Sequence, residues 1–513
     1  MPQRTMDASH LGLQATFAAR SLRWRHYLSN SRAWRTNIGR MRTILCYLLA
    51  LVPPPHQIVE RSAAAIGGLD KLQAVSAVRT VEQGLEYFTS VGDPRVAPAA
   101  IAETITTLRR MAPVGLRQTT VTSFAMANQS FTQTIIASDS VVSRGGLASA
   151  SGFDAAVASE VLALAPDRIL LTALAASDLT ALPDSVIDGV PHHVVAFHWA
   201  DARVRLAIDA ATGFPDAVWL VRAYPTFVFW SLWGDITIGT RWSGWTLEAN
   251  GVWYPRQRLV TFNGEPWRRF LVTALDVAPA APPDSFAIAD SVRSQFATIS
   301  RGGSTMPEPT LTPMTLADGV VLFAGYYQSA LIREPEGIIV LDASQSNAKS
   351  RAVLAQAARL FPGVPIAAVV TTASAWMQIG GVREYVSRGI PIYALDVNAA
   401  RVRAVIAAPY ATHPDSLARV PRAASLRVVH VVHAPVTLGS GANEIRLLPV
   451  ASGDLLVYWP ARRWLYASDM IVPPAFEPNY NAARAETLRR TITALGIPVD
   501  SVFAFHLPLA AWH

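Results

Sequence analysis

The spacing of apolar residues predicts how the chain begins to fold after residue 56. Between Gln57 and Leu85, apolar residues recur at helical spacing and are interrupted at Gly67-Gly68. This pattern predicts an amphipathic helix with a break, followed by a strand that begins at Thr80-Val81. Residues 86–180 carry weaker signals, which are strand-like near Thr119–Phe124 and Phe131–Ile136 and helical near Ala155–Leu164.

The clearest pattern lies between residues 190 and 277, where short segments rich in aromatic and β-branched residues alternate with turns. Asn263-Gly264 is typical of a tight hairpin, so the region is predicted to be an antiparallel meander. Eight of the fourteen tryptophans lie between Trp199 and Trp267. Aromatic residues dominate core energetics, so we expect these to fill the concave face of a curved sheet more than to line a groove. The predicted strands are His193–Phe197, Arg203–Ile208, Ala217–Tyr224, Thr226–Trp230, Asp235–Trp242, Trp245–Leu247, Gly251–Thr261 and Arg268–Leu275.

From residue 319 the pattern changes to strands that alternate with helices, which predicts an α/β layered domain. Phe361-Pro362-Gly363 and Gly389 supply the two helix ends. The predicted strands are Gly319–Phe323, Gln328–Arg333, Gly337–Leu341, Ile366–Thr371 and Pro391–Ala394, and the predicted helices are Ala348–Leu360 and Gly381–Arg388.

A stretch rich in proline and small residues, 277–314, separates the two patterns and is typical of a linker. The length of 513 residues fits two globular units and a tail. We therefore expect a basic tail with a signal or anchor segment over residues 1–55 and a β-rich domain over 56–300. A linker over 301–318 and an α/β domain over 319–513 complete the prediction.

The basic charge of the chain belongs to its N-terminal tail. The formal net charge is +7, and residues 1–42 hold eight arginines and a single acid, Asp7, so the remaining residues sum to zero. A nucleic-acid partner would need a basic patch on a folded domain, and we expect none. The single cysteine, Cys46, excludes an intrachain disulfide and a cysteine-based zinc site.

A short apolar run, residues 43–52, follows Arg40 and Arg42 and precedes three prolines. It is too short for a membrane span, which needs about 20 residues, but it fits the centre of a secretory signal. We expect an exported protein, periplasmic or anchored to the membrane through residues 41–55; a buried N-terminal helix is the alternative. Met41 stands directly before this run, so either Met1 or Met41 would be the start.

The N-terminal half contains four loose motifs, spread over about 230 residues. They are Ala65-Ile66-Gly67-Gly68-Leu69, Leu206-Ala207-Ile208-Asp209 with Thr212-Gly213-Phe214-Pro215, Asn250-Gly251-Val252-Trp253-Tyr254-Pro255 and Pro283-Asp284-Ser285-Phe286. In these motifs the region resembles the curved half-barrel of periplasmic lipoprotein carriers, which implies a curved antiparallel sheet that binds acyl chains.

The C-terminal region contains several marked positions in a fixed order. Asp342 ends a strand, Thr371-Thr372 and Gly380-Gly381 bracket a loop, and a strand pair follows in Val457-Tyr458-Trp459-Pro460 and Trp464-Leu465-Tyr466-Ala467-Ser468-Asp469. In this order the region resembles the metallo-β-lactamase-fold hydrolases, which implies an αβ/βα sandwich. The family has an acidic residue at the position of Asp342, its loop reads Thr-His-x-His-x-Asp-His-x-Gly-Gly, and Asp469 and His506 match two of its metal ligands.

The resemblance fails at most of the ligand positions. The two leading histidines are replaced by Ala373 and Ala375, the aspartate by Met377 and the next histidine by Gln378. Zinc needs imidazole, thiolate or carboxylate donors, which these side chains lack. The histidine expected before Tyr458 is also missing, since the segment 449–454 offers only an aspartate.

Three functional hypotheses follow. The first is a non-catalytic envelope protein that binds a small or lipidic ligand in the vacated cleft, lined by Ala373, Ala375, Trp376, Met377 and Gln378, with no cofactor; Asp469 and His506 are then only remnants. The second is a hydrolase with one atypical metal site, zinc being the first candidate, built from Asp454, Asp469, His506 and His413. The third is a lipid or lipoprotein carrier that acts through the N-terminal domain. The ligand's identity and the oligomeric state are left open.

Overall fold

The computed structural model describes residues 53–87, 100–124, 129–149, 152–227, 229–298, 307–430, 434–450, 452–471 and 478–512. The predicted basic tail, the apolar run 43–52 and linker residues 301–306 lie outside the described residues. Among the helices described, none combines the length and the hydropathy needed to cross a membrane.

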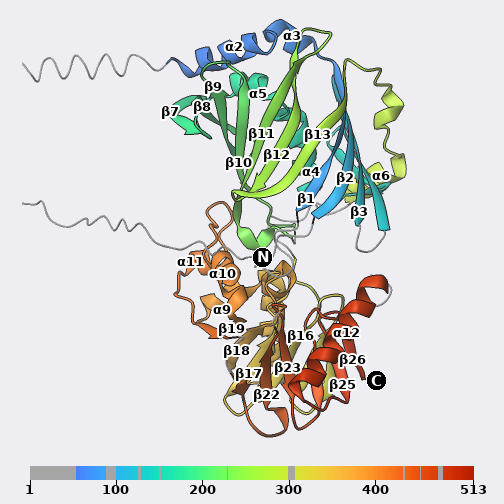
Figure 1. The fold of residues 1–513 in the computed structure, drawn as a ribbon, viewed down its shortest axis with the longest axis vertical. Helices are drawn as coiled ribbons and strands as arrows, with labels where there is room; N and C mark the ends of the chain where they lie inside the picture. The colour runs from blue at the N-terminus through green and yellow to red at the C-terminus, as the bar shows by residue number, and fades with distance from the viewer. Residues whose placement is uncertain are drawn as a thin grey trace, which may run out of the picture. The chain divides into compact units, whose positions relative to one another are not determined.

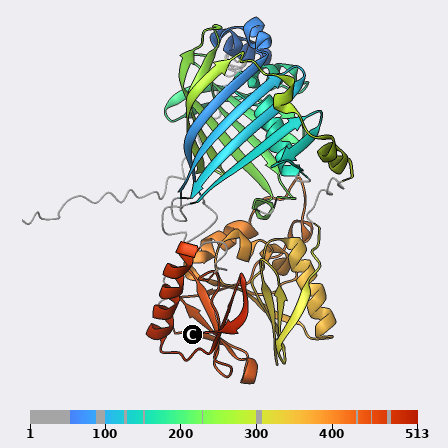
Figure 2. The same cartoon turned by 90° about the vertical axis from the view of Figure 1, so that its right-hand side faces the viewer.

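The N-terminal half is built around one antiparallel sheet of thirteen strands (Figures 1 and 2). In the order β6-β5-β4-β3-β2-β1-β13-β12-β11-β10-β9-β8-β7, every pairing joins consecutive strands except that of β1 with β13, and the consecutive strands β6 and β7 form the two edges. The strands are β1 (Ala77–Tyr87), β2 (Ala100–Met111), β3 (Val114–Phe124), β4 (Gln129–Ser138), β5 (Val141–Arg144), β6 (Leu147–Ala148), β7 (Thr180–Ile187), β8 (Val190–Trp199), β9 (Ala202–Asp209), β10 (Pro215–Ala223), β11 (Asp235–Leu247), β12 (Trp253–Phe262) and β13 (Glu265–Val277).

Helices pack against one face of this sheet and form its main core. The helices are α2 (Pro55–Ala65), α3 (Leu69–Ala74), α4 (Gly152–Ala163) and α5 (Ile169–Ala175), whereas α6 (Asp290–Thr298) contacts β5 and β6 and is not part of this core. Val59 of α2, Leu72 of α3 and Ile169 of α5 are fully buried with inward-facing strand residues such as Val204 and Leu206. The alternation of buried and exposed residues along the strands therefore gives the sheet one apolar face, which the helices cover.

The predicted meander is confirmed in outline, and its details change. The segment Thr226–Trp230, predicted as a strand, contains turn residues and no strand among its described positions. The two segments predicted as separate strands, Asp235–Trp242 and Trp245–Leu247, belong to the single strand β11. The hairpin at Asn263-Gly264 forms as expected, with φ of 49° and 91° at its two residues. Short aromatic segments resemble strands, but Pro225 and Gly234 bound a loop here.

The C-terminal part contains two mixed sheets. The first has the order β14-β15-β16-β17-β18-β19-β20, with parallel pairing from β17 onwards, and the second has the order β21-β22-β23-β24-β25-β26. The first sheet holds β14 (Thr312–Ala317), β15 (Val320–Ala324), β16 (Ser329–Glu334), β17 (Gly337–Leu341), β18 (Ile366–Thr371), β19 (Ile392–Leu395) and β20 (Leu426–Val429). The second holds β21 (Val436–Leu438), β22 (Ile445–Pro449), β23 (Leu455–Trp459), β24 (Trp464–Tyr466), β25 (Ser501–Ala504) and β26 (Leu507–Ala511).

Three hydrophobic clusters place these sheets and their helices in four layers. One face of the first sheet, with Val340 and Val369, packs on helices through Val353, Val382 and Val402. Its other face packs on the second sheet, whose outer face in turn packs on α12. The helices are α7 (Asn347–Leu360), α8 (Trp376–Ile379), α9 (Val382–Ser387), α10 (Asp396–Ile406), α11 (Ser416–Arg419) and α12 (Pro478–Leu495). This layering is the αβ/βα sandwich that the sequence predicted.

Strand β14 lies inside the segment predicted to be a linker. It pairs antiparallel with β15, with Met314 opposite Leu322. The first sheet therefore begins at Thr312 rather than at residue 319. Proline at position 313 misled the prediction, although proline is compatible with an edge strand, which β14 is.

Candidate functional site

The loop that carries the predicted ligand positions follows β18 and contains the short helix α8. Backbone hydrogen bonds hold it in place: Gln345 donates to the Met377 carbonyl at 2.8 Å, and Gly381 donates to the Ala343 carbonyl at 2.8 Å. A Cβ atom on Gly380 would lie 2.2 Å from the Gln345 carbonyl oxygen. The close approach of the two backbones explains why the sequence needs glycine at this position.

The side chains of this loop are mostly packed inside the sandwich. Ala375, Trp376 and Gln378 are buried, and the Trp376 ring makes an edge contact with Tyr327. Both polar atoms of the Gln378 amide are buried and have no hydrogen-bond partner among the described residues. The ligand cleft predicted from Ala373, Ala375, Met377 and Gln378 stays a prediction. The side chains of Ala375 and Gln378 are buried by packing and do not face an open space.

Asp342 anchors the start of this loop. Its Oδ1 accepts from the Thr372 backbone N–H at 2.8 Å, and its Oδ2 accepts from the Tyr466 hydroxyl at 2.7 Å. Ser468 extends the network by donating to Thr372 Oγ1 at 2.9 Å. Burial raises the pKa of Asp342 to about 7. The carboxyl group of Asp342 therefore links the ends of β17, β18 and β24. These hydrogen bonds assign it a structural role.

The two predicted metal remnants, Asp469 and His506, do lie together. His506 Nε2 is 3.3 Å from Asp469 Oδ1, and His506 Nδ1 donates to the Tyr326 carbonyl at 2.6 Å. Among the described residues, no third histidine, cysteine or carboxylate completes a metal-binding group with this pair. Two donors do not fit a zinc site, which takes three or four protein ligands, and neither Asp454 nor His413 supplies the missing one.

The described residues do contain one group with metal-ligand spacing, in the N-terminal sheet: His192, Asp209 and Asp216. His192 Nδ1 donates to the Val190 carbonyl at 2.8 Å, and its Nε2 is 3.4 Å from Asp216. Asp209 already accepts from the backbone N–H groups of two turn residues, at 2.7 and 2.8 Å. These contacts show that the three side chains hold a turn in place, so a structural role explains why they lie together.

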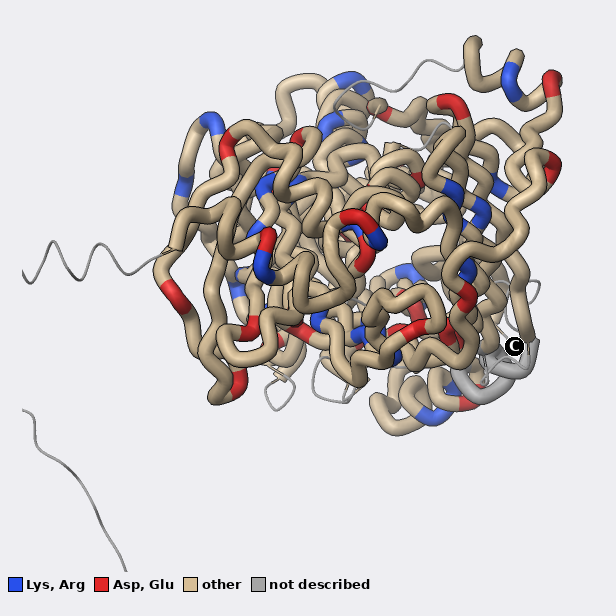
Figure 3. The backbone as a smooth tube through the Cα atoms, turned by 90° about the horizontal axis from the view of Figure 1, so that it is seen from above, with Lys and Arg blue, Asp and Glu red and all other residues tan. Residues whose placement is uncertain are grey.

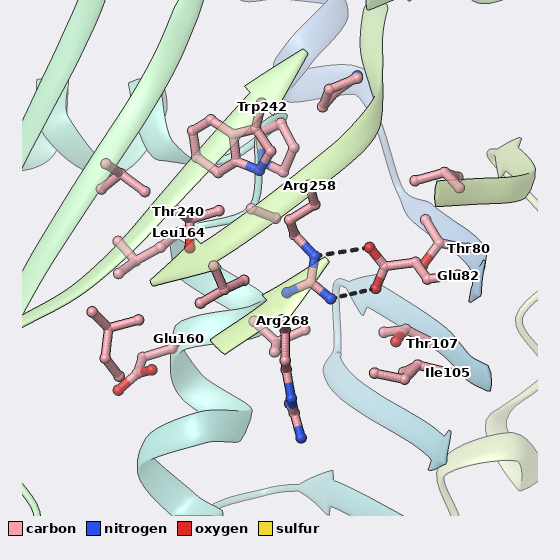
Figure 4. A pocket seen from close by; sticks show the side chains of 18 of the residues that line it. Thr80, Glu82, Ile105, Thr107, Glu160, Leu164, Thr240, Trp242, Arg258 and Arg268 are labelled. Carbon is pink, nitrogen blue, oxygen red and sulfur yellow. Dashed lines mark hydrogen bonds and ion pairs between the residues drawn. The ribbon is translucent and has the colours of Figure 1, made fainter. Parts of the chain in front are cut away.

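The N-terminal sheet also lines a cavity that opens to solvent, with a volume of about 210 Å³. Figure 4 shows its side chains converging from several strands and from the segment that begins with α4. Apolar residues dominate the wall, and threonine and glutamine residues interrupt it. The apolar lining includes Ile105, Val157, Val161, Leu164, Val218, Leu220, Ile238, Trp242, Val260 and Val272, and the polar lining includes Thr80, Thr107, Gln118, Thr240 and Gln257.

Charged side chains in the cavity wall are paired with each other. Arg258 donates from Nε and Nη2 to the two carboxylate oxygens of Glu82, at 2.8 and 2.7 Å, as the dashed lines in Figure 4 mark. Arg109 donates from Nη2 to Asp167 at 2.7 Å and to the Tyr254 hydroxyl at 3.1 Å. The buried Nη1 of Arg109 has no hydrogen-bond partner among the described residues.

Two further ion pairs complete the wall. Glu160 accepts from Arg222 at 2.8 Å and from the Tyr224 hydroxyl at 2.6 Å, and burial raises its pKa. Arg268 pairs with Glu86, and its Nε lies 3.5 Å from Glu103. Burial also raises the pKa of Glu103, to about 7.

Sequence reasoning missed this cavity, although a signal was present. Glu82 has the same strand parity as Val78 and Thr80, so alternation places a carboxylate on the inward face of β1. The tryptophans were expected to fill the core of the sheet more than to line a groove, and they do both. Trp242 belongs to the core cluster and also lines the cavity, which Trp230 and Trp267 line as well.

Outside the cavity, charge is distributed without a dominant sign. In the view of Figure 3, basic and acidic residues are interspersed along the described chain. This agrees with the near-zero charge of the sequence after residue 42.

Comparisons with known proteins identify no family. No protein-family model matches the chain, and no curated protein matches it. Among solved structures, an inverting sec-alkylsulfatase from a Pseudomonas species is 15% identical over 39% of this chain, with a TM-score of 0.29. The match spans 39% of that protein's own length.

Two metallo-β-lactamases are also among the structural matches. The enzyme from Pontibacter korlensis is 13% identical over 39% of this chain and 94% of its own, with a TM-score of 0.30. The metallo-β-lactamase DIM-1 is 11% identical over 40% of this chain and 92% of its own, with a TM-score of 0.31. The structural neighbours thus include metallo-β-lactamase-fold proteins, at low identity and over part of the chain.

Proposed function

We propose that this is an exported, non-catalytic protein that binds a small lipidic ligand in the cavity of its N-terminal sheet. The observation that carries the proposal is the cavity itself, which is lined by a curved sheet and has a mostly apolar wall with a few polar groups. Ligand sites in proteins commonly combine these properties. In this proposal the C-terminal sandwich is a scaffold.

The state of the C-terminal loop supports the non-catalytic part of this proposal. Hydrolysis by this fold would need a bound metal to lower the pKa of water, and Asp469 and His506 alone do not fit a zinc ion. The loop positions that would hold other ligands are Ala373, Ala375, Met377 and Gln378, three of which have apolar side chains. No catalytic step is therefore assigned to these residues.

Binding can be tested with an uncharged fluorescent reporter, N-phenyl-1-naphthylamine, whose emission rises in apolar surroundings. We expect saturable binding to the full chain. Val161→Trp fills part of the cavity and should weaken binding by about tenfold or more, the loss of roughly 1.4 kcal/mol. The matched control Val186→Trp changes a valine that is 69% exposed on β7 and should bind as the wild type does. Equal binding by all three proteins would refute the proposal.

A metal-dependent hydrolase is the second candidate, because Asp469 and His506 lie 3.3 Å apart. Elemental analysis of the purified protein separates the two candidates. About one metal ion per chain, lost together with ester hydrolysis in the double variant Asp469→Ala/His506→Ala, would favour the hydrolase.

A further inference from the structure

The charges around the cavity reveal what kind of ligand it can hold. Each charged side chain in the wall already has a partner of opposite sign: Arg258 with Glu82, Arg109 with Asp167, and Glu160 with Arg222. Arg268 likewise pairs with Glu86 and Glu103. No charge in the wall is thus left to neutralise a charged ligand.

The balance extends to the whole network. Five guanidinium groups face six carboxyl groups, which are Arg109, Arg168, Arg222, Arg258 and Arg268 against Glu82, Glu86, Glu103, Glu160, Asp167 and Asp201. Burial raises the pKa of Glu103 to about 7, so this group is partly protonated near neutral pH. The network then carries a net charge between −1 and zero.

Uncharged polar groups of a ligand, by contrast, would find hydrogen-bond partners in the cavity. Thr80, Thr240 and Gln257 line the cavity among the apolar residues, as do Thr107 and Gln118, which already share a hydrogen bond of 3.1 Å. The unpartnered Nη1 of Arg109 can donate to a hydroxyl or ester oxygen, and its positive charge is already compensated by Asp167. A neutral oxygen in this cavity gains hydrogen bonds, whereas a buried ion without a counter-charge loses several kcal/mol of solvation.

We infer that the cavity selects an uncharged amphiphile, such as a fatty alcohol or a neutral acyl ester, over a fatty-acid anion or an alkylammonium ion. This inference rests on the proposed function, because it names the ligand class of the same cavity. The selectivity comes from charge pairing within the wall, so changing one member of a pair should change the preferred ligand charge.

The test uses three displacers with the same alkyl chain: decanol, decanoate and decyltrimethylammonium. Each competes with N-phenyl-1-naphthylamine on the full chain near neutral pH. Decanol should displace the reporter at a concentration at least about tenfold lower than either ion. Equal displacement by decanoate and decanol from the wild type would overturn the inference.

Variants of the Arg258–Glu82 pair separate charge selection from general hydrophobicity. Glu82→Gln leaves Arg258 unpaired and should improve displacement by decanoate about tenfold, while Arg258→Gln should do the same for decyltrimethylammonium. The double variant should restore the wild-type order. Glu308→Gln, which alters a pair with Arg351 outside the cavity, is the control and should change nothing.

The outcomes distinguish this inference from the proposed function. If the reporter does not bind the wild type, the proposed function fails. If it binds and the single variants leave the order of the three displacers unchanged, only the inference about charge fails. Circular dichroism checks each variant's fold, and where a single variant does not fold, the wild-type series and the double variant decide.

Discussion

The cavity of the N-terminal sheet and the loop from Thr372 to Gly381 differ in how their buried polar groups are paired. Around the cavity, arginines and carboxylates are retained in pairs and leave a space between them. In the loop, most candidate donors are absent, Trp376 packs inside, and the Gln378 amide is buried without partners. The contrast teaches that the paired polar groups and the open cavity occur together in the region where the sequence resemblance was looser, and not in the loop where it was closer.

The largest effect should come from breaking a buried pair beside the cavity. Arg109→Leu removes the closer of the two guanidinium partners of Asp167, and the side chains of Arg109 and Asp167 are almost fully buried, at 3% and 1% exposure. The variant should lose about 3 kcal/mol of unfolding free energy, because the buried carboxylate keeps only Arg168, at 3.0 Å, as a counter-charge. Chemical denaturation followed by tryptophan fluorescence measures this loss, since eight of the fourteen tryptophans lie between Trp199 and Trp267.

The control for this change is Glu308→Gln, which breaks a partly exposed pair with Arg351 and leaves the contact of Arg351 with the buried Glu384 in place. Exposed pairs contribute about 0–1 kcal/mol, so the denaturation midpoint should barely move. A similar loss in both variants would show that burial does not distinguish the pairs around the cavity from those on the surface.

The buried Asp342 gives the second prediction, which concerns pH. Its pKa in the folded protein is about 7, above the ordinary value of 3.8, so folding favours the protonated form. The penalty for ionising it is absent below pH about 4 and complete above pH about 7, where it reaches at most about 4 kcal/mol. Wild-type stability should therefore fall as pH rises through this window.

Asp342→Asn removes the titration and keeps the shape of the side chain. The unfolding free energy of this variant minus that of the wild type should rise with pH between about 4 and 7, because only the wild type has a carboxyl group to ionise. Denaturation across this pH range gives the difference directly, and a flat difference would mean that Asp342 keeps an ordinary pKa.

The smallest effect should be a gain in stability from the loop. Gln378→Met replaces a buried amide without hydrogen bonds by an apolar side chain of similar length, which should stabilise the protein by about 1 kcal/mol. The melting temperature would rise, and the control Gln73→Met, at an exposed residue, should leave it unchanged. A lower melting temperature would mean that the amide has a partner in solution, which would reopen this loop as a binding site.

Much of the fold was predictable, for reasons that differ between the two regions. In the sandwich, helix ends such as Phe361-Pro362-Gly363 and the buried strand Ile366–Thr371 are local signals, and both elements form where predicted. In the N-terminal sheet, alternation predicted the later strands. Strands β2 to β6 were harder to predict because they carry many polar residues. Thr119 of β3 and Thr134 of β4, for example, hydrogen-bond to each other across the two strands. With polar residues on both faces, the sequence of a strand does not show which face is buried.

The candidate site was less predictable than the fold. Asp469 and His506 were singled out through the family resemblance, and the structure places their side chains 3.3 Å apart, while their part in a metal site stays a prediction. The Glu82–Arg258 pair joins residues 176 positions apart, and no local pattern relates them. Its partners become neighbours only through the pairing of β1 with β13 and of β13 with β12, a non-local fact that one sequence does not state.

The same pairing governs the order in which the chain can assemble during synthesis. Val78 of β1 finds its partner in Val277 of β13, so the edge of β1 stays open until about 200 further residues have left the ribosome. Closing so long a loop carries an entropic cost that local hairpins avoid, which makes this seam a slow, late step. Until it closes, the first hairpins present an unpaired edge to other chains, and this is the stage at which the protein most needs protection from aggregation.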